Sequence, residues 1–509
     1  MAQTHRASTG KQIVFLTGIQ VWNQAVNLLK TMVLSRVFSL DEYGTYAKMI
    51  LVLDFFFAIV VLNLPSAANY FIAKSDSEAS KRNFLYTYYI LCTAVGILMG
   101  SLLYLGSPII SNIFHNTSIM NYRWYLGFVP LFQIIMKAKT YVLAAEGKSK
   151  LVAKISLIYS AFVLGSLWII SRSNHALGVC LGSFFALEGA YALVGYFIAY
   201  RYTCHEAKAG VQKLVFDKKV VAEIYKYIVP VGLSSLILVI NTKVDKIFVS
   251  LTSSDATYAL YTNASKELPV AIISTALSAV MIPKIVTLLK SNDKDGAIKI
   301  WRHTFGMVSW AFSLLLIGTV AFAPEVMTLL YSAKYLEGLT IFRIYLFLIP
   351  FHCINYGMLL NAFGKTNYLL KCSVISLVLN IALDFLGYFT IGLPGLGLAT
   401  VVSAAVMAAL EIQYSAQLLG VTVWNLIPVK KLLAFAAANL FLCGCAMLAH
   451  KMLNIDLFIG GVGEAILLGF ICSGVSLLIH LKQLKAEWSG LNAISSTTDQ
   501  SSVLGLTDS

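Results

Sequence analysis

Long apolar stretches that hold few charges constrain the fold of this chain more than any other feature. A helix needs about 20 predominantly apolar residues to cross the ~30 Å hydrocarbon core of a bilayer, and the sequence contains fourteen charge-poor windows of that length. Hydrophobic residues make up 58% of the 509 residues and charged residues 12%, and the mean hydropathy is +0.77. The sequence therefore predicts an all-α polytopic membrane protein with about 14 transmembrane helices in a lipid bilayer.

The fourteen predicted spans follow one another along most of the chain. We place them at residues 13–38, 46–72, 84–105, 123–144, 151–171, 176–200, 222–251, 258–289, 301–331, 340–362, 369–390, 394–419, 432–450 and 458–481.

Positive charge is distributed unevenly between the two sides of these spans. The formal net charge is +14, and the connections on the side of the N-terminus hold most of the Lys and Arg, whereas the opposite connections hold Arg172, Lys334 and Lys451. Cytoplasmic loops carry such an excess of Lys and Arg. The sequence therefore predicts that both termini are cytoplasmic, and the surplus charge is explained by topology rather than by a nucleic-acid partner.

Three short matches at nearly constant offset indicate an internal duplication. YGTY at 43–46 matches YALY at 258–261, AKSD at 73–76 matches LKSN at 289–292, and AAEGKSK at 144–150 matches NAFGKTN at 361–367. Because the offset contains six spans, both repeats enter the membrane in the same direction.

This duplication gives the predicted domain organisation. We expect a six-helix bundle at 1–200, a basic cytoplasmic linker at 201–221, a second six-helix bundle at 222–419, two additional transmembrane helices at 420–481 and a disordered cytoplasmic tail at 482–509.

Charged residues also occur inside the predicted spans. A charge at the centre of a bilayer costs ~2.5–3.5 kcal/mol on insertion scales, so such residues face protein or a water-filled cavity. The set comprises Lys30, Asp54, Lys137, Lys139, Glu188, Lys243, Asp245, Lys246, Lys266, Glu267 and Glu411. As a set they predict a polar interior along a substrate path, while for any single residue a structural ion pair between helices is the alternative.

Helical spacing places several polar residues on shared faces. In the first span Gln20, Asn23, Asn27 and Lys30 recur every three or four residues, which puts them on one side of the helix. The seventh span holds Asn241 and Asp245 one turn apart, with Lys243 and Lys246 on a neighbouring face, and the eighth holds Lys266 and Glu267. The repeat offset makes Lys30 the counterpart of Asp245, so we predict either that these two pair across a central cavity or that each contacts substrate separately.

Signatures of catalysis or nucleotide use do not emerge from the sequence. The His residues are scattered and form no paired metal-ligand spacing, and Gly147-Lys148-Ser149 lacks the upstream glycine of a P-loop. We therefore predict no metal site, no cofactor and no enzymatic activity. Uphill transport would then draw on a gradient of H⁺ or Na⁺.

Three segments resemble Wzx-type flippases of lipid-linked oligosaccharides. LSRVFSLDEYGTYA at 34–47 is similar to the turn after their first helix, and VDKIFVSL at 244–251 and AFGKT at 362–366 resemble second-half counterparts. The resemblance implies the multidrug, oligosaccharidyl-lipid and polysaccharide exporter superfamily, in which two six-helix bundles form a V. It also implies a flippase that moves undecaprenyl-diphosphate-linked oligosaccharide, such as an O-antigen repeat unit of lipopolysaccharide biosynthesis, to the periplasmic leaflet of the bacterial inner membrane, with polysaccharide polymerase machinery as a partner.

Candidate roles follow from the chemistry of such a substrate. Lysines suit a diphosphate headgroup and amides suit a sugar, so the predicted substrate-binding residues are Lys30, Lys243, Lys246, Lys266, Gln20, Asn23, Asn27 and Asn241. The predicted ion-coupling or charge-pair residues are Asp54, Glu188, Asp245, Glu267 and Glu411. A cation-coupled multidrug exporter of the same superfamily is the first alternative, and a membrane glycosyltransferase or polymerase is the second.

Overall fold

A computed structural model describes most of the chain. Its backbone is described for residues 2–75, 77–173, 176–201, 216–268, 270–453 and 456–504, and side chains are described in these ranges except at 2–17, 176, 234, 271–272, 453–460 and 492–504. The elements in the described ranges are helical. They are α1 (Ala2–Val37), α2 (Leu40–Phe56), η1 (Phe57–Val61), η2 (Leu64–Ser66), α3 (Ala67–Lys74), α4 (Glu78–Ile113), α5 (Ser118–Asn121), α6 (Arg123–Ala145), α7 (Ser149–Ser171), α8 (Ala176–Tyr200), α9 (Lys218–Thr252), α10 (Asp255–Ala264), α11 (Ala271–Lys290), α12 (Lys294–Ala321), α13 (Ala323–Leu330), η4 (Ala333–Gly338), α14 (Leu339–Leu346), α15 (Ile349–Cys353), α16 (Met358–Ala362), α17 (Thr366–Ile391), α18 (Leu393–Leu419), α19 (Val423–Leu426), α20 (Val429–Leu453) and α21 (Asp456–Leu504).

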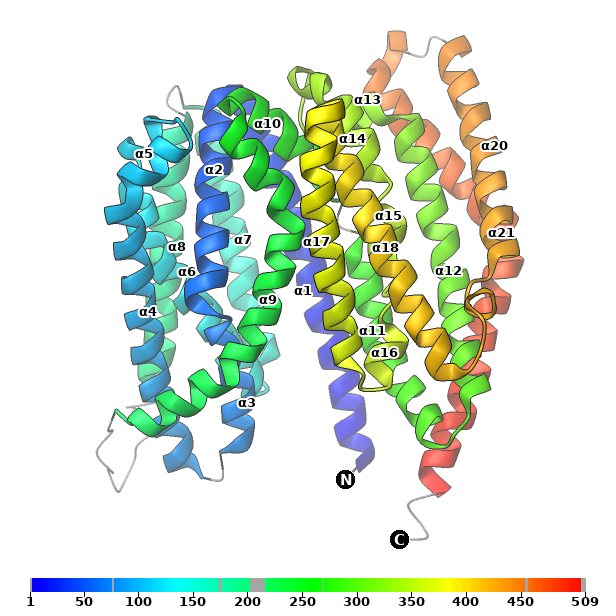
Figure 1. The fold of residues 1–509 in the computed structure, drawn as a ribbon, viewed down its shortest axis with the longest axis horizontal. Helices are drawn as coiled ribbons and strands as arrows, with labels where there is room; N and C mark the ends of the chain where they lie inside the picture. Colours follow the sequence, from blue (N-terminus) through cyan, green and yellow to red (C-terminus); the bar gives the residue numbers. More distant parts are fainter. Residues whose placement is uncertain are drawn as a thin grey trace. The chain divides into compact units, whose positions relative to one another are not determined.

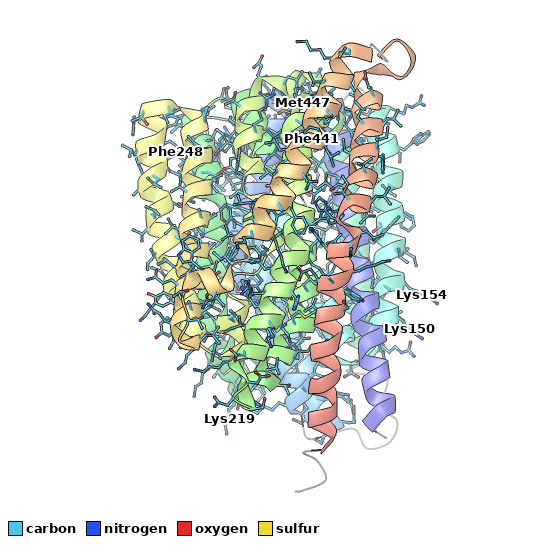
Figure 2. All side chains as sticks on the ribbon, turned by 90° about the vertical axis from the view of Figure 1, so that its right-hand side faces the viewer. Lys150, Lys154, Lys219, Phe248, Phe441 and Met447 are labelled. Carbon is cyan, nitrogen blue, oxygen red and sulfur yellow. The ribbon has the colours of Figure 1, made fainter. Side chains whose placement is uncertain are left out.

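These helices confirm the predicted all-α membrane fold. Within the described residues, twelve helices are long and apolar enough to cross a bilayer, and the bent pair Ala333–Leu346 and Ile349–Ala362 raises the number to thirteen if it is one span. The remaining predicted span, 13–38, falls in α1, whose side chains are described from Gly18 onward. Large apolar side chains such as Phe441 and Met447 of α20 point outward from their bundle (Figure 2), with 72% and 48% of their surface exposed. Such outward faces suit contact with lipid tails.

The chain forms two compact units, residues 1–259 and 260–509. In the first unit α4 packs on α6, α6 on α8 and α1 on α7, and in the second α17 packs on α18 and α12 packs on α20 and α21. Figure 1 shows that the long helices within each unit run side by side. Helix α9 contacts α2, α3 and α4, so it belongs to the first unit, although the duplication groups this span with the second bundle.

Glycines let the two most extensive helix pairs approach closely. A Cβ added to Gly100 of α4 would overlap the carbonyl oxygen of Gly127 of α6, and Gly387 of α17 and Gly395 of α18 face each other in the same way. Small residues at helix interfaces permit such backbone contact in membranes, where lipid tails give little hydrophobic drive for association. These sequence positions therefore determine which helix faces pack.

The motif at 34–47 is a capped helix start. Ser39 and Glu42 form a reciprocal capping box, in which the Ser39 hydroxyl accepts a hydrogen bond from the Glu42 amide and the Glu42 carboxylate accepts one from the Ser39 amide. This arrangement satisfies amides that a helix N-terminus otherwise leaves unpaired. Phe38 and Tyr46 pack edge to face behind the turn. The motif thus sets where α2 begins.

Four predicted spans are interrupted rather than continuous, and one of them, at 301–331, breaks at Phe322 between α12 and α13. The span at 46–72 passes from α2 into a π-helical turn at Phe57–Val61 and then through Leu62 and Asn63, whose φ angles of 47° and 59° are left-handed. The span at 258–289 breaks after α10, and the span at 340–362 bends by 50° between α14 and α15, where Pro350 follows. Broken helices expose backbone groups that membranes tolerate only where protein or a cavity satisfies them.

The structure describes parts of the predicted linker and tail. Residues 202–215 of the linker at 201–221 lie outside the described residues, whereas Lys218–Val221 already belong to α9. At 482–491, where the sequence predicts a disordered tail, α21 continues as a helix. The reason is tertiary, because the buried Glu487 carboxylate binds Lys431 of α20 and lies 2.6 Å from the Nδ1 atom of His303 of α12.

Candidate functional site

In the first unit, Lys30 lies inside the helix bundle beside a buried carboxyl group. Its Nζ atom is 3.9 Å from the ring centroid of Phe184 and 5.7 Å from that of Tyr46. Glu188 interacts electrostatically with Lys30 and accepts a hydrogen bond from Gln133, and 9% of its surface is exposed. A lysine over aromatic faces gains cation–π attraction, so the rings and Glu188 together hold a positive charge within the bundle.

The polar stripe of α1 continues from this lysine. Gln20 and Asn27 are exposed and Asn23 is half-buried, so the stripe presents amide groups next to Lys30. Side-chain amides both donate and accept hydrogen bonds, as sugar hydroxyls require. The structure thus places the predicted amides and the predicted lysine on one helix, with Glu188, a predicted ion-coupling residue, beside the lysine.

A second pair joins α2 to α9 in the same unit. The Lys243 Nζ atom lies 2.5 Å from the Asp54 Oδ2 atom, with 29% and 46% of the two side chains exposed. Asp54 precedes the π-helical turn, and Lys137 of α6 lies over the Phe57 ring of that turn at 3.8 Å. The predicted substrate-binding Lys243 and the predicted ion-coupling Asp54 are therefore partners of each other.

The other predicted residues of α9 lie within one turn of Lys243. Asp245 is 2% exposed, whereas Asn241 and Lys246 are half-buried. Lys30, the repeat counterpart of Asp245, lies over the rings of Phe184 and Tyr46 and interacts electrostatically with Glu188. The pairing of Lys30 with Asp245 stays a prediction.

In the second unit, Lys266 and Glu267 follow α10 where its span breaks. The Glu267 Oε2 atom lies 3.3 Å from the His352 Nδ1 atom. Lys266, Glu267 and His352 line a small pocket together with Phe342 and Tyr345, and this pocket lies beside the bend between α14 and α15. Discontinuous helices in transporters often form ligand sites, because their free backbone groups point into a cavity.

Glu411 of α18 lies elsewhere in the second unit. It is 7% exposed, it interacts electrostatically with Tyr356, and a Cβ added to Gly357 would lie 3.4 Å from its carboxyl group.

Sequence reasoning missed two further buried polar residues of this unit, although their spacing of one helical turn was a signal. Asn380 and Asp384 of α17 are 1% and 2% exposed.

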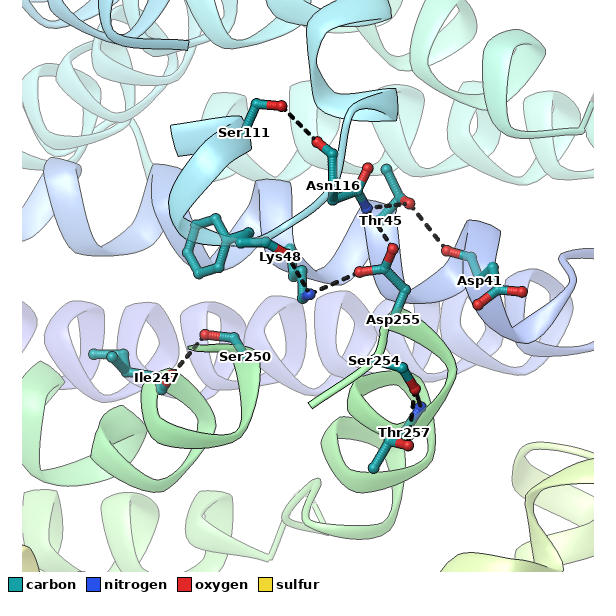
Figure 3. Close-up of polar contacts among 11 residues, drawn as sticks. Asp41, Thr45, Lys48, Ser111, Asn116, Ile247, Ser250, Ser254, Asp255 and Thr257 are labelled. Atoms are coloured by element: carbon teal, nitrogen blue, oxygen red, sulfur yellow. Dashed lines mark hydrogen bonds and ion pairs between the residues drawn. The ribbon is translucent and has the colours of Figure 1, made fainter. Parts of the chain in front are cut away.

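Sequence reasoning also missed a cluster of polar side chains at the α9–α10 turn of the first unit. The Lys48 Nζ atom lies 2.7 Å from Asp255 Oδ1, and Asn116 Nδ2 donates to Asp255 Oδ2 at 2.7 Å and to Thr45 Oγ1 at 2.8 Å. Lys48 also donates to the Phe114 carbonyl at 3.2 Å. Figure 3 shows this cluster, which we call the Lys48 clasp, joining α2, the α4–α5 turn and the start of α10. A lysine within the predicted span 46–72 was the available signal.

Comparison with known proteins gives the class of this chain. Residues 33–339 match the protein family described as "Polysaccharide biosynthesis protein". This match covers more than half of the chain, so the chain belongs to that family. The predicted membership of the multidrug, oligosaccharidyl-lipid and polysaccharide exporter superfamily is thereby confirmed.

Particular relatives are similar over part or most of the chain. It is 27% identical over 171 residues to the probable lipid II flippase MurJ of two Helicobacter pylori strains, J99 and 26695, which is 32% of this chain and 37% of each relative. The chain thus matches little more than a third of the length of these relatives.

Solved structures show the same fold. A lipid II flippase MurJ in an inward closed conformation aligns with a TM-score of 0.69 and 16% identity, over 92% of this chain and 100% of that one. An inward-facing MATE family multidrug resistance transporter aligns with a TM-score of 0.63 and 15% identity, over 78% and 94%. The names of these relatives describe flippases and transporters rather than enzymes. The sequence likewise predicts that this chain is not an enzyme.

Proposed function

We propose that the protein is a flippase for an undecaprenyl-diphosphate-linked oligosaccharide, such as an O-antigen repeat unit. In this proposal it resides in the bacterial inner membrane with both termini cytoplasmic, and it moves its substrate from the cytoplasmic to the periplasmic leaflet by ion-coupled alternating access. Membership of a polysaccharide biosynthesis family supports the substrate class, and the fold of a lipid II flippase supports the transport of a lipid-linked sugar.

The observation that carries the proposal is the position of Lys30. Its ammonium group is inside the bundle, held by the rings of Phe184 and Tyr46 and balanced by Glu188. A diphosphate headgroup is anionic and forms strong charge-assisted hydrogen bonds with such a group. In a site shielded from water the attraction is stronger than at a surface.

The neighbouring amides extend the same site toward a sugar. Gln20, Asn23 and Asn27 lie on α1 within three turns of Lys30, and the first and third are exposed. Hydroxyl groups of an oligosaccharide both donate and accept hydrogen bonds, and these amides do the same. Lys243, Lys246 and Lys266 are proposed as further headgroup contacts.

Ion coupling is proposed to involve the carboxyl groups that adjoin these lysines. Glu188 beside Lys30 and Asp54 beside Lys243 each balance a lysine charge. Binding of an anionic headgroup to the lysine competes with the carboxylate, so uptake of H⁺ or Na⁺ by the carboxylate favours headgroup binding. Rocking of the repeats then exposes the site to the other leaflet.

Reconstituted flipping of a fluorescent undecaprenyl-diphosphate oligosaccharide in proteoliposomes tests this function. Lys30→Met keeps the volume of the side chain and removes its charge, so we expect flipping to fall about tenfold or more, given ~1.5–3 kcal/mol for a hydrogen bond to a charged group. Lys154→Met changes an exposed lysine of α7 (Figure 2) and should leave flipping unchanged.

A double variant separates a role of Lys30 and Glu188 in transport from a role in structural support. Lys30→Met leaves Glu188 without the lysine charge that balances it, whereas Lys30→Met with Glu188→Gln removes both charges and should recover stability. The proposal requires that the double variant be as stable as the native protein and still not flip. Native flipping by the double variant would show that Lys30 only balances Glu188, and absence of flipping by the native protein would exclude this substrate.

A further inference from the structure

A histidine lies between two carboxyl groups at one end of the second unit. The His450 Nδ1 atom of α20 is 3.2 Å from Glu464 Oε2 of α21, and its Nε2 atom is 3.7 Å from Glu325 Oε1 of α13. The Phe322 ring packs against the imidazole, with the ring centroids 6.0 Å apart. Figure 1 shows α13, the end of α20 and the start of α21 at the same end of this unit. The three residues, here called the His450 triad, join three helices.

Glu464 is the most constrained member of the triad. Its side chain is 1% exposed, compared with 26% for His450 and 23% for Glu325. Both of its carboxyl oxygens are buried and neither has an aligned hydrogen-bond partner among the described residues. A buried carboxylate without compensation is strongly unfavourable. The His450 imidazole, which carries a positive charge when it binds a proton, is the described group placed to compensate it.

The charged groups around the triad include no other candidate for this compensation in the described part of the chain. On α13 the titratable neighbour is Glu325, on α21 it is Glu464, and on α20 the next residue, Lys451, is exposed. The residue facing the imidazole at the end of α12 is the apolar Phe322. Among the described side chains, no group of three or more His, Cys, Asp or Glu has the arrangement of a metal site, so a proton is the ligand that fits.

The triad lies at an apolar pocket of about 330 Å³ between α12, α13, α20 and α21. Glu325 itself lines this pocket, and so does Ala465, which follows Glu464 along α21. Phe322 and Ala465 belong to a buried apolar cluster that also contains Leu468 and Cys472. Any movement that hydrates Glu464 must therefore also disturb the wall of the pocket.

We propose that the His450 triad is a proton-binding site that controls the opening of this apolar pocket. With the proton bound, the positive imidazole joins α13, α20 and α21, and Cys472 on the inner wall of the pocket stays buried. When the proton leaves to solvent, the Glu464 carboxylate must gain water, and the end of α21 separates from α20. The inference concerns the second unit alone and does not depend on the identity of the transported substrate.

The sign of the pH dependence follows from proton counting. The closed form holds one proton more than the open form, so low pH favours closure and rising pH favours opening. For a difference of one proton, the ratio of open to closed forms changes about tenfold per pH unit. Histidine changes charge between about pH 5 and pH 8, which is the range to be measured.

The reactivity of Cys472, a pocket-lining residue, provides the test. The full-length protein in detergent is reacted with N-ethylmaleimide across that pH range, and modification of the Cys472 peptide is followed by mass spectrometry. A thiol reacts as its thiolate, so an unchanging pocket gives a logarithmic rate with a slope of about 1 against pH. With the proposed opening, the slope in the native protein should approach about 2 over the part of the range where the triad loses its proton.

Two variants test whether Glu464 and His450 cause the additional pH dependence of Cys472 labelling. Glu464→Gln carries no charge at any pH, so the pocket should stay closed and the slope should fall to about 1. His450→Asn removes the partner of Glu464 and should shift the pH range in which the slope of the logarithmic Cys472 labelling rate exceeds about 1. Equal profiles in the native protein and both variants would overturn the proposal, as would a change in Cys472 labelling on addition of Na⁺ at constant pH.

Discussion

Replacement of Asp255 by alanine removes the carboxylate that balances the buried ammonium group of Lys48. Lys48 is 1% exposed, and after the substitution its described polar partner is the Phe114 carbonyl at 3.2 Å. A buried charge that loses its partner costs ~3–5 kcal/mol. Because 21% of the Asp255 side chain is exposed and water screens part of the attraction, we expect the lower end, about 3 kcal/mol.

The same structure predicts that the two partners are not equivalent. Lys48→Met leaves Asp255 with the Asn116 amide and with partial access to water, so we expect a smaller loss of about 1–2 kcal/mol. Combining Lys48→Met with Asp255→Ala leaves no buried charge. The double variant should therefore be more stable than Asp255→Ala alone.

Thermal unfolding of the purified protein in one detergent, at one heating rate, measures these differences. One kcal/mol shifts the Tm of a domain of this size by roughly 2–4 °C, so Asp255→Ala should lower the apparent Tm by on the order of 10 °C. Lys74→Ala is the matched control, because Lys74 and Glu223 of the same unit are 3.8 Å apart and both side chains are 59% exposed. Such a pair is worth at most ~1 kcal/mol.

Two results would refute the reasoning about the Lys48 clasp. One is a loss of stability for Asp255→Ala no larger than that for Lys74→Ala, which would mean that Lys48 reaches water in the folded protein. The other is a double variant whose loss equals the sum of the two single losses. Additivity would show that Lys48 and Asp255 do not interact.

Three further predictions concern packing, the C-terminal helix and topology. Gly44→Ala adds a Cβ that would overlap the backbone at the α9–α10 turn, so the apparent Tm should fall, whereas Gly18→Ala has open space and should not lower it. Glu487→Ala removes the buried carboxylate that holds α21 to α12 and α20, and limited proteolysis should then cut after residue 482 faster than in the native protein. In intact cells, Ser80→Cys should be protected from a membrane-impermeant thiol reagent and Arg172→Cys should react; the reverse labelling pattern would invert the proposed topology.

Local sequence features account for most of the fold. The apolar windows predicted the membrane helices because burial in lipid depends on the composition of each segment taken singly. The interruptions were harder to predict. The π-helical turn at Phe57–Val61 lies in a largely apolar stretch and contains no proline, so composition alone did not distinguish it from a continuous helix. The helix at 482–491 in place of a tail likewise depends on a distant contact, that of Glu487 with Lys431.

The candidate site was likewise predictable from the sequence only in part. The sequence by itself determined that charges lie within the membrane helices and which of them share a helix face, because a spacing of three or four residues fixes the face. It did not determine their partners. Lys243 and Asp54 are 189 residues apart. Lys48 meets Asp255 and His450 meets Glu464 only after the helices pack, and packing likewise brings Lys30 within electrostatic range of Glu188. Helical periodicity is local, whereas the pairing of charges depends on which helices become neighbours, and that is decided by the tertiary structure.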